Sequence, residues 1–346
     1  MKLKVVIRNT SPIFSAATGE NTIDIKGNIG VPNGLPFSRT RTMLIMSDRG
    51  ETPKPVHVPV VPGNTMRNLL RRTMLDELIM PTLKGKGALS IGAYAAAYAG
   101  NASGNPEGVP ATFDETLKVR NHAFLGLFGG GPRMMEGRLR MDSLYPIHVD
   151  ALRVIGEGFE EHLSSGKITD IVWQRRTDPV LKIKEESTAE IIKDGPAAIT
   201  QWAVNAMGAS LERAQKRKAK NDEDAASEGP SVRGLAAFNA HEVVIPGIDW
   251  LQSMTLVDPS PAQVGLVLLA LAKMPNKAIA GGHAKGYGAF DIRDIQVDGT
   301  SVWDGAAFAD SEQLHAYFDA AMEAMDQLST EEFESFVATS KDRDEA

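Results

Sequence analysis

The sequence predicts an α+β fold, and three observations lead to this prediction. Apolar and polar side chains alternate over residues 2–8, as they do in a half-buried strand. Residues 66–78 and 259–274 repeat apolar side chains at helical spacing, and β-prone runs follow them at 137–149, 235–245, 254–257 and 289–297. With the other segments taken as insertions, the order is strand, helix, strand, strand, helix, strand, which is the ferredoxin-like βαββαβ frame.

The first strand is expected to bury one face, formed by Leu3, Val5 and Ile7, and to carry a mixed second face. A loop rich in glycine, proline and asparagine follows over residues 15–41. Loops of this length inside a compact domain are uncommon and are usually functional or disordered. Two cations, Arg39 and Arg41, stand at its far end and are candidate phosphate ligands.

The first helix begins after a proline and a glycine that end a short apolar strand, and Asn64 or Thr65 is its expected cap. Arg67 and Arg71 lie one turn apart on the flank opposite the apolar side chains. A capped helix N-terminus with arginines on its first turns suits a phosphate group. The alternative is an ordinary amphipathic helix with a solvated basic face.

A segment of small residues at 81–112 reads as an insertion with a helical core. A further helix is expected at 113–125, with Asp114 as its cap and the glycines at 129–131 as the turn that ends it. Arg133 follows that turn as a candidate phosphate ligand. The alternative is that Arg133 only faces solvent, since the sequence around it would be the same in that case.

Residues 171–186 are expected to form a projecting hairpin, because two β-prone arms flank an Asp-Pro turn. Arg175 and Arg176 lie in its first arm near Trp173. Single-stranded nucleic acids bind to surfaces that combine cations with aromatic rings. A basic hairpin without a ligand is an equally good interpretation of this pattern. A helix and a charged loop are expected to follow, up to residue 230.

The stretch 279–292, IAGGHAKGYGAFDI, is a glycine-rich turn that enters the last strand of the frame. Four of its residues are glycines: Gly281, Gly282, Gly286 and Gly288. Glycines let the backbone approach a ligand closely, and His283 and Lys285 between them offer donors to an anion. Tyr287 stands where a P-loop needs serine or threonine, which excludes that motif, and it is a further candidate ligand-binding residue of the turn. A plain loop before a strand is the alternative.

Composition limits the classes of protein that fit. The 346 residues are 42% hydrophobic and 23% charged, which suffices for a sizeable core, and no run approaches a membrane span. The chain has no cysteine, which excludes disulfides, thiolate catalysis and cysteine-ligated zinc. We expect a cytoplasmic protein without membrane contact, bound metal or other cofactor.

The net charge of −7 hides a strong asymmetry. Residues 1–75 hold eleven lysines and arginines against four acids, whereas residues 301–346 hold two against twelve. A basic N-terminal body with acidic C-terminal helices and tail can carry a nucleic-acid-binding face that the bulk charge conceals.

Three motifs together resemble a known family: VPGNTMRNLLRR at 61–72, LGLFGGG at 125–131 and GGHAKGYGAFDI at 281–292. They are similar to those of the RAMP superfamily of CRISPR-associated proteins, and in particular of the backbone subunit of type IV CRISPR effector complexes. The resemblance extends from residue 2 to about residue 297. It implies an RRM-like palm (1–80, 136–170 and 231–300), a helical finger insertion (81–135) and a thumb hairpin with a helix and a mobile loop (171–230), with the acidic helices and tail at 301–346 outside it.

The resemblance implies a non-catalytic, RNA-binding subunit whose copies stack head to tail along CRISPR RNA (crRNA). The spacer of that RNA would then pair with target DNA in antiviral defence or plasmid interference. Other subunits of the type IV complex are the further partners implied, including a crRNA-processing RAMP endonuclease and a DinG-type helicase.

One departure from the family bears on catalysis. Relatives in type III complexes cut RNA with an aspartate beyond an Ile-Gly step, and Asn33 occupies that place here, with Asp24 upstream. Asparagine cannot serve as a carboxylate base or metal ligand, so we expect no ribonuclease activity. The alternative is a RAMP-type endoribonuclease that acts on crRNA or target RNA through His283 or Asp24.

Overall fold

The computed structural model describes most of the chain, namely residues 1–17, 22–23, 35–50, 52–100, 111–131, 135–177 and 236–337. The chain forms two compact units. The first contains Met1–Thr18, Thr40–Asp170 and Val243–Ala346, and the second contains Gly19–Arg39 and Ile171–Glu242. The division into palm, finger and thumb stays a prediction. Among the described residues, no helix has the length and apolar content needed to cross a bilayer.

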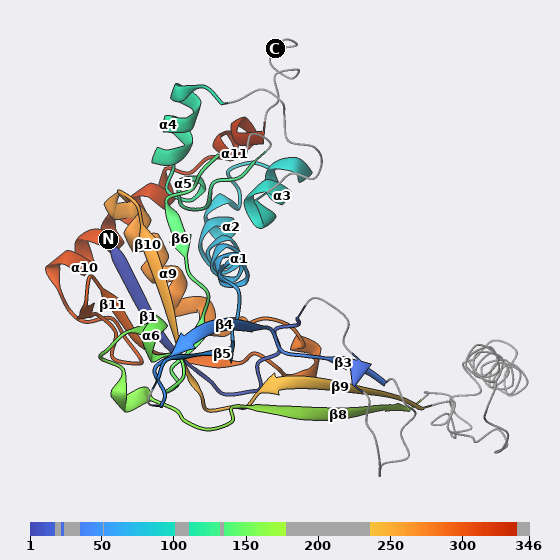
Figure 1. The fold of residues 1–346 in the computed structure, drawn as a ribbon. Helices are drawn as coiled ribbons and strands as arrows, with labels where there is room; N and C mark the ends of the chain where they lie inside the picture. Colours follow the sequence, from blue (N-terminus) through green and yellow to red (C-terminus); the bar gives the residue numbers. More distant parts are fainter. Residues whose placement is uncertain are drawn as a thin grey trace, which may run out of the picture. The chain divides into compact units, whose positions relative to one another are not determined.

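The first unit is built on an antiparallel sheet (Figure 1). Its main strands are β1 (Lys2–Asn9), β6 (Leu139–Met141), β10 (Asp249–Leu256) and β11 (Phe290–Val297), with short β7 (Tyr145–Pro146) and β12 (Thr300–Ser301) at its margins. The spatial order is β12-β11-β1-β10-β6. Counted along the frame, the four main strands lie in the order 4-1-3-2, which confirms the α+β, ferredoxin-like prediction.

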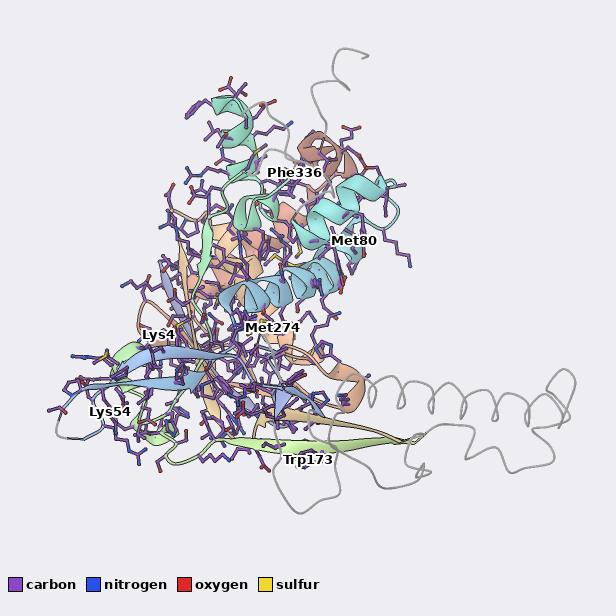
Figure 2. The ribbon with its side chains drawn as sticks, turned by 45° about the vertical axis from the view of Figure 1, so that its right-hand side comes forward. Lys4, Lys54, Met80, Trp173, Met274 and Phe336 are labelled. Carbon is purple, nitrogen blue, oxygen red and sulfur yellow. The ribbon has the colours of Figure 1, made fainter. Side chains whose placement is uncertain are left out.

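Two helices cover one face of this sheet. Helix α1 (Gly63–Met74) continues through a π-helical turn, η1 (Leu75–Ile79), into α2 (Met80–Leu83), and α9 (Pro261–Lys273) packs beside α1. Met274, which follows α9, belongs to the same core and lies near α1 (Figure 2). Ser260 caps α9 in a capping box with Gln263.

The opposite face of the sheet is also covered, by the hairpin of β4 (Thr42–Ser47) and β5 (Lys54–Pro59) and by α6 (Leu152–Ile155). Val6 of β1 packs there against Ile45 and Val58. The second face of β1 is mixed, as predicted, because Val6 is buried whereas Lys4 and Arg8 are partly exposed. The expectation of an unbroken loop at 15–41 is wrong in part, because β2 (Thr22–Ile23) and β3 (Leu35–Ser38) lie in it.

The second unit has its own sheet, in the order β2-β3-β9-β8, with β8 at Thr169–Thr177 and β9 at Ala236–Val244. Strand β3 pairs parallel to β9 through Phe37 and Ala240. β8 covers the first arm of the predicted hairpin, whereas the second arm and the helix and charged loop predicted up to residue 230 lie outside the described residues.

The inserted helices form part of the first unit. They are α3 (Ile91–Ala99), α4 (Phe113–Asn121) and α5 (Leu125–Phe128), and the C-terminal helix α11 (Thr330–Val337) packs against α3. Asp114 does not cap α4. Thr112 does, in a capping box with Glu115, because its side chain accepts from the third amide of the helix.

The acidic C-terminal region also packs on the first unit. Helix α10 (Glu312–Asp326) lies along α9 (Figure 1). The crossing is close at Gly265, where an added methyl group would overlap the Tyr317 carbonyl oxygen and lie 2.8 Å from the Ala321 Cβ atom. Gly265 is therefore required for this contact.

A buried histidine between α4 and α11 predicts a pH-dependent stability. His122 is 7% exposed, and its Nδ1 accepts from the amides of Phe124 and Leu125 at 3.1 and 2.9 Å. Burial lowers its pKa from 6.5 to about 4, against the opposing effect of Glu332. The folded state thus resists protonation, so the stability that neutral His122 provides is complete above pH 6.5 and is lost as the pH falls toward 4.

We expect the free energy of unfolding to fall by about 3 kcal/mol between pH 7 and pH 4 through this group alone. His122→Asn is the matched variant, because the asparagine Oδ1 can accept the same two amide hydrogens without titrating. Urea unfolding of both proteins at each pH isolates the effect. Parallel pH profiles for the two proteins would show that His122 does not titrate in this way.

Candidate nucleic-acid interface

The glycine turn presents two basic side chains to solvent. His283 and Lys285 are exposed and lie in a short 3-10 turn, which Gly282 and Gly286 flank with φ of 84° and 77°. The amide of Lys285 donates to the Gly282 carbonyl at 2.8 Å. Tyr287, only 7% exposed, lies beneath the turn, where a methyl group on Gly282 would meet its ring at 2.6 Å. The predicted ligand Tyr287 therefore supports the turn.

Backbone hydrogen bonds fasten this turn to the segment that follows β1. Gly281 donates to the Phe14 carbonyl and Gly288 donates to the Pro12 carbonyl, both at 2.9 Å. Ile279 closes the turn by donating to Gly288, also at 2.9 Å. No residue larger than glycine fits at position 288, because a methyl group there would overlap the Ile279 carbonyl oxygen. The turn is therefore held at both ends.

The same segment also holds Arg41. The Arg41 amide donates to the Ser15 carbonyl at 2.6 Å, next to the Phe14 carbonyl that binds Gly281, and Ala16 forms a bridge with Thr40. Successive carbonyls of an extended chain point to opposite sides, so Arg41 and Gly281 lie on opposite sides of this segment. Two cationic stretches that are remote in the sequence thus meet on residues 13–16.

The arginines of α1 have other partners. Arg71 is 5% exposed and donates to the carbonyls of Phe128 and Gly129, each at 3.1 Å, while its guanidinium lies 4.9 Å from the Phe128 ring centroid. Arg67 is half-buried and also donates to Phe128. Burial lowers the pKa of both, to about 10 for Arg71. Arg71 joins α1 to α5 and, because it is buried, does not fit the alternative of a solvated basic face.

The N-terminus of α1 is not an open anion site. The N-cap residue is Pro62, with no side-chain cap, so neither Asn64 nor Thr65 has the predicted capping role. A methyl group on Gly63 would overlap the Met141 carbonyl oxygen. Carbonyl oxygens, which repel an anion, therefore crowd the start of the helix. Asn64 itself remains exposed.

Among known proteins, a similarity was found to solved structures but not to family models or curated sequences. No family model and no curated protein matches the sequence. A solved structure described as a Type IV-B CRISPR Complex covers 90% of this chain and 96% of its own chain, with a TM-score of 0.48 and 14% sequence identity. Because the TM-score and the sequence identity are both low, the function is inferred from the chain's own residues and geometry.

The remaining predicted ligands lie elsewhere or outside the described residues. Arg39 belongs to the second unit, where it is exposed and its guanidinium lies 5.9 Å from the Phe37 ring centroid. Trp173 of β8 is 43% exposed. The side chains of Arg175 and Arg176 lie outside the described part, as do the residues Arg133, Asp24 and Asn33.

A charged cluster at the end of β1 was not predicted from the sequence. Asp249 is 3% exposed, accepts two 2.7 Å bonds from Arg8, and lies 2.8 Å from His162 Nδ1. Burial alone would raise the pKa of Asp249, but the hydrogen bonds from Arg8 and His162 outweigh it and lower the pKa. An aspartate that opens an apolar strand, DWLQSMTL, was the available signal. Within the described ranges, no group of three or more His, Asp or Glu residues suits a metal ion.

Proposed function

We propose that this protein is a non-catalytic backbone subunit of a type IV CRISPR effector complex. Its copies would stack head to tail along CRISPR RNA and present the spacer for pairing with target DNA. A heterologous interface repeated in this way gives an open helical assembly whose length the RNA limits. Such a subunit needs to recognise only phosphates and shape, because base pairing reads the sequence.

The observation that carries the proposal is the meeting of Arg41 and the glycine turn on residues 13–16, beside the end of β1. Arg41 is half-buried and, within the described part of the chain, has no acidic partner at salt-bridge distance. His283 and Lys285 of the turn are exposed. Basic side chains on a rigid backbone suit the phosphates of a single strand, which supply most of the affinity of such complexes.

The three motifs that resemble the family have structural roles that fit this proposal. The motif at 125–131 supplies the carbonyls that bind Arg67 and Arg71, and the motif at 281–292 forms the exposed turn. The motif at 61–72 thus joins the sheet to the inserted helices.

Arg41→Ala and Lys285→Ala are each expected to weaken binding of single-stranded RNA about fivefold. Each should also flatten the slope of log affinity against log salt by about 0.7, because one phosphate contact is lost. Fluorescence anisotropy with several RNA sequences at four salt concentrations measures both quantities. The loss should be the same for all sequences.

Lys118→Ala is the matched control, since Lys118 is an exposed lysine on α4 away from the turn. It should leave both affinity and slope unchanged. Equal losses in all three variants would indicate only nonspecific attraction of a polyanion. Unaltered binding in Arg41→Ala and Lys285→Ala would remove the proposed interface.

A further inference from the structure

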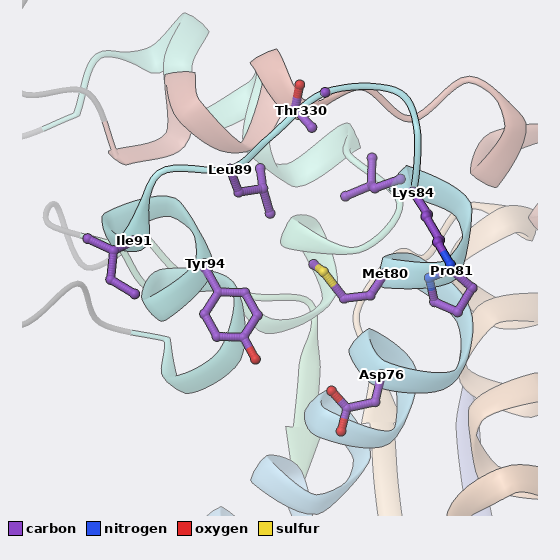
Figure 3. Close-up of a pocket in the computed structure, with 10 residues that line it drawn as sticks. Asp76, Met80, Pro81, Lys84, Leu89, Ile91, Tyr94 and Thr330 are labelled. Carbon is purple, nitrogen blue, oxygen red and sulfur yellow. The ribbon is translucent and has the colours of Figure 1, made fainter.

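A surface pocket of about 770 Å³ lies between the continuation of α1 and the inserted helix α3 (Figure 3). Its wall is mostly apolar and includes Met80, Pro81, Leu89, Ile91 and Tyr94. Ile91 is 83% exposed and Tyr94 is 38% exposed, so both side chains are open to solvent at the pocket. The volume falls in the range of small-molecule sites.

Tyr94, which lines the pocket, belongs to a stack with a second ring and a cation outside the lining. The rings of Tyr94 and Tyr98 stack with centroids 5.7 Å apart and planes inclined by 17°. The guanidinium of Arg72 lies 4.7 Å from the Tyr98 ring centroid. Tyr94 is the member of this group that lines the pocket, so a flat ligand can extend the stack there.

Polar groups of both signs stand at the same pocket. Asp76 Oδ2 accepts from Lys277 at 2.9 Å, and a carboxylate has further acceptor positions. The Tyr94 hydroxyl points toward the side on which Asp76 lies, while Lys84 stands across the pocket from Tyr94 (Figure 3). An exposed lysine suits a phosphate, and a carboxylate suits an amino group on a base.

We propose that this pocket binds one unpaired nucleobase of a single-stranded nucleic acid. The base stacks on Tyr94 against the apolar wall, Asp76 accepts from its amino group, and Lys84 attracts the neighbouring phosphate. An apolar peptide side chain would use the apolar wall but neither the stacked ring nor the opposite charges. Bases with an exocyclic amine should therefore bind better than uracil.

This site is separate from the glycine turn and does not depend on it. It adds a base contact to the phosphate contacts of the proposed function, but it is tested with mononucleotides, whose binding does not require assembly on RNA. A protein that fails to hold CRISPR RNA yet binds mononucleotides here would refute the proposed function alone.

The test is saturation-transfer NMR on the full chain with AMP, GMP, CMP and UMP, one at a time. We expect saturation of the base protons in the wild type and in Tyr94→Phe, and at least a fivefold weaker signal in Tyr94→Leu, which keeps an apolar side chain without the ring. Phe113→Leu is the control, because Phe113 is 79% exposed on α4 and does not line the pocket.

A second variant distinguishes loss of ligand binding from a folding defect caused by Tyr94→Leu. Pro81→Glu adds a carboxylate at an exposed rim position and should weaken AMP binding by at least fivefold through repulsion of its phosphate. Equal base signals in the wild type and in both pocket variants would overturn the proposal. It would also be overturned if no mononucleotide binds and Tyr94→Leu changes only the mass of assemblies between copies, because the pocket would then be a protein contact.

Discussion

Replacing Asn9 with leucine is expected to lower the free energy of unfolding by about 4 kcal/mol. Asn9 is fully buried at the end of β1. Its Nδ2 donates to Ser11 and Ile245 at 2.8 and 2.9 Å, and its Oδ1 accepts from the Ile248 amide and Trp250 Nε1 at 3.0 and 3.1 Å. Leucine has a similar shape but leaves these four polar groups without their partner, and each unmet group costs about 1–3 kcal/mol.

Urea denaturation followed by circular dichroism measures this effect. Asn276→Leu is the control, because Asn276 is exposed after α9 and the same substitution there should change stability by less than about 0.5 kcal/mol. If Asn9→Leu and Asn276→Leu unfold at the same urea concentration as the wild type, the four hydrogen bonds do not contribute as described.

Gly265→Val is expected to cost about 4 kcal/mol and to detach α10 from α9. Its Cβ would overlap a backbone carbonyl oxygen, that of Tyr317, which cannot move without the helix. Amide hydrogens of α10 should then exchange faster than those of α9, which mass spectrometry of peptides after exchange can follow.

Gly92→Val is the matched control for a valine placed inside a helix. A methyl group on Gly92 of α3 would meet only the Ser90 hydroxyl, at 3.8 Å, so that variant should change stability by about 0.5 kcal/mol or less. Unchanged exchange of α10 in Gly265→Val would show that the two helices are not packed as closely as their backbones indicate.

Segments with strong local signals were predicted well from the sequence. The second frame helix was expected over residues 259–274, and α9 begins at Pro261 because Ser260 caps it and the proline fits its first turn. The last strand and the glycine turn before it also lie where alternation and glycine content indicated. Local propensity and tertiary packing agree in these segments.

Features that depend on remote partners were not predicted. Strand β4 was missed because its methionines and leucine have no strong strand preference, and its pairing with β5 supplies the missing stability. Arg71 has the spacing of a solvent-facing cation, and only the carbonyls of Phe128 and Gly129, far along the chain, decide its burial. Within the candidate site, the meeting of Arg41 with Gly281 rests on backbone bonds to residues 14 and 15 that no local pattern encodes.

The most direct test of the central claim is expression of the full chain together with a CRISPR repeat-spacer transcript. The protein is purified through a high-salt wash, and its mass, absorbance ratio and bound RNA are then determined. We expect a large particle that holds one discrete repeat-derived RNA, with an integral number of protein copies set by the RNA length. A monomer without nucleic acid, under the same conditions and with the other subunits of the complex coexpressed, would contradict it.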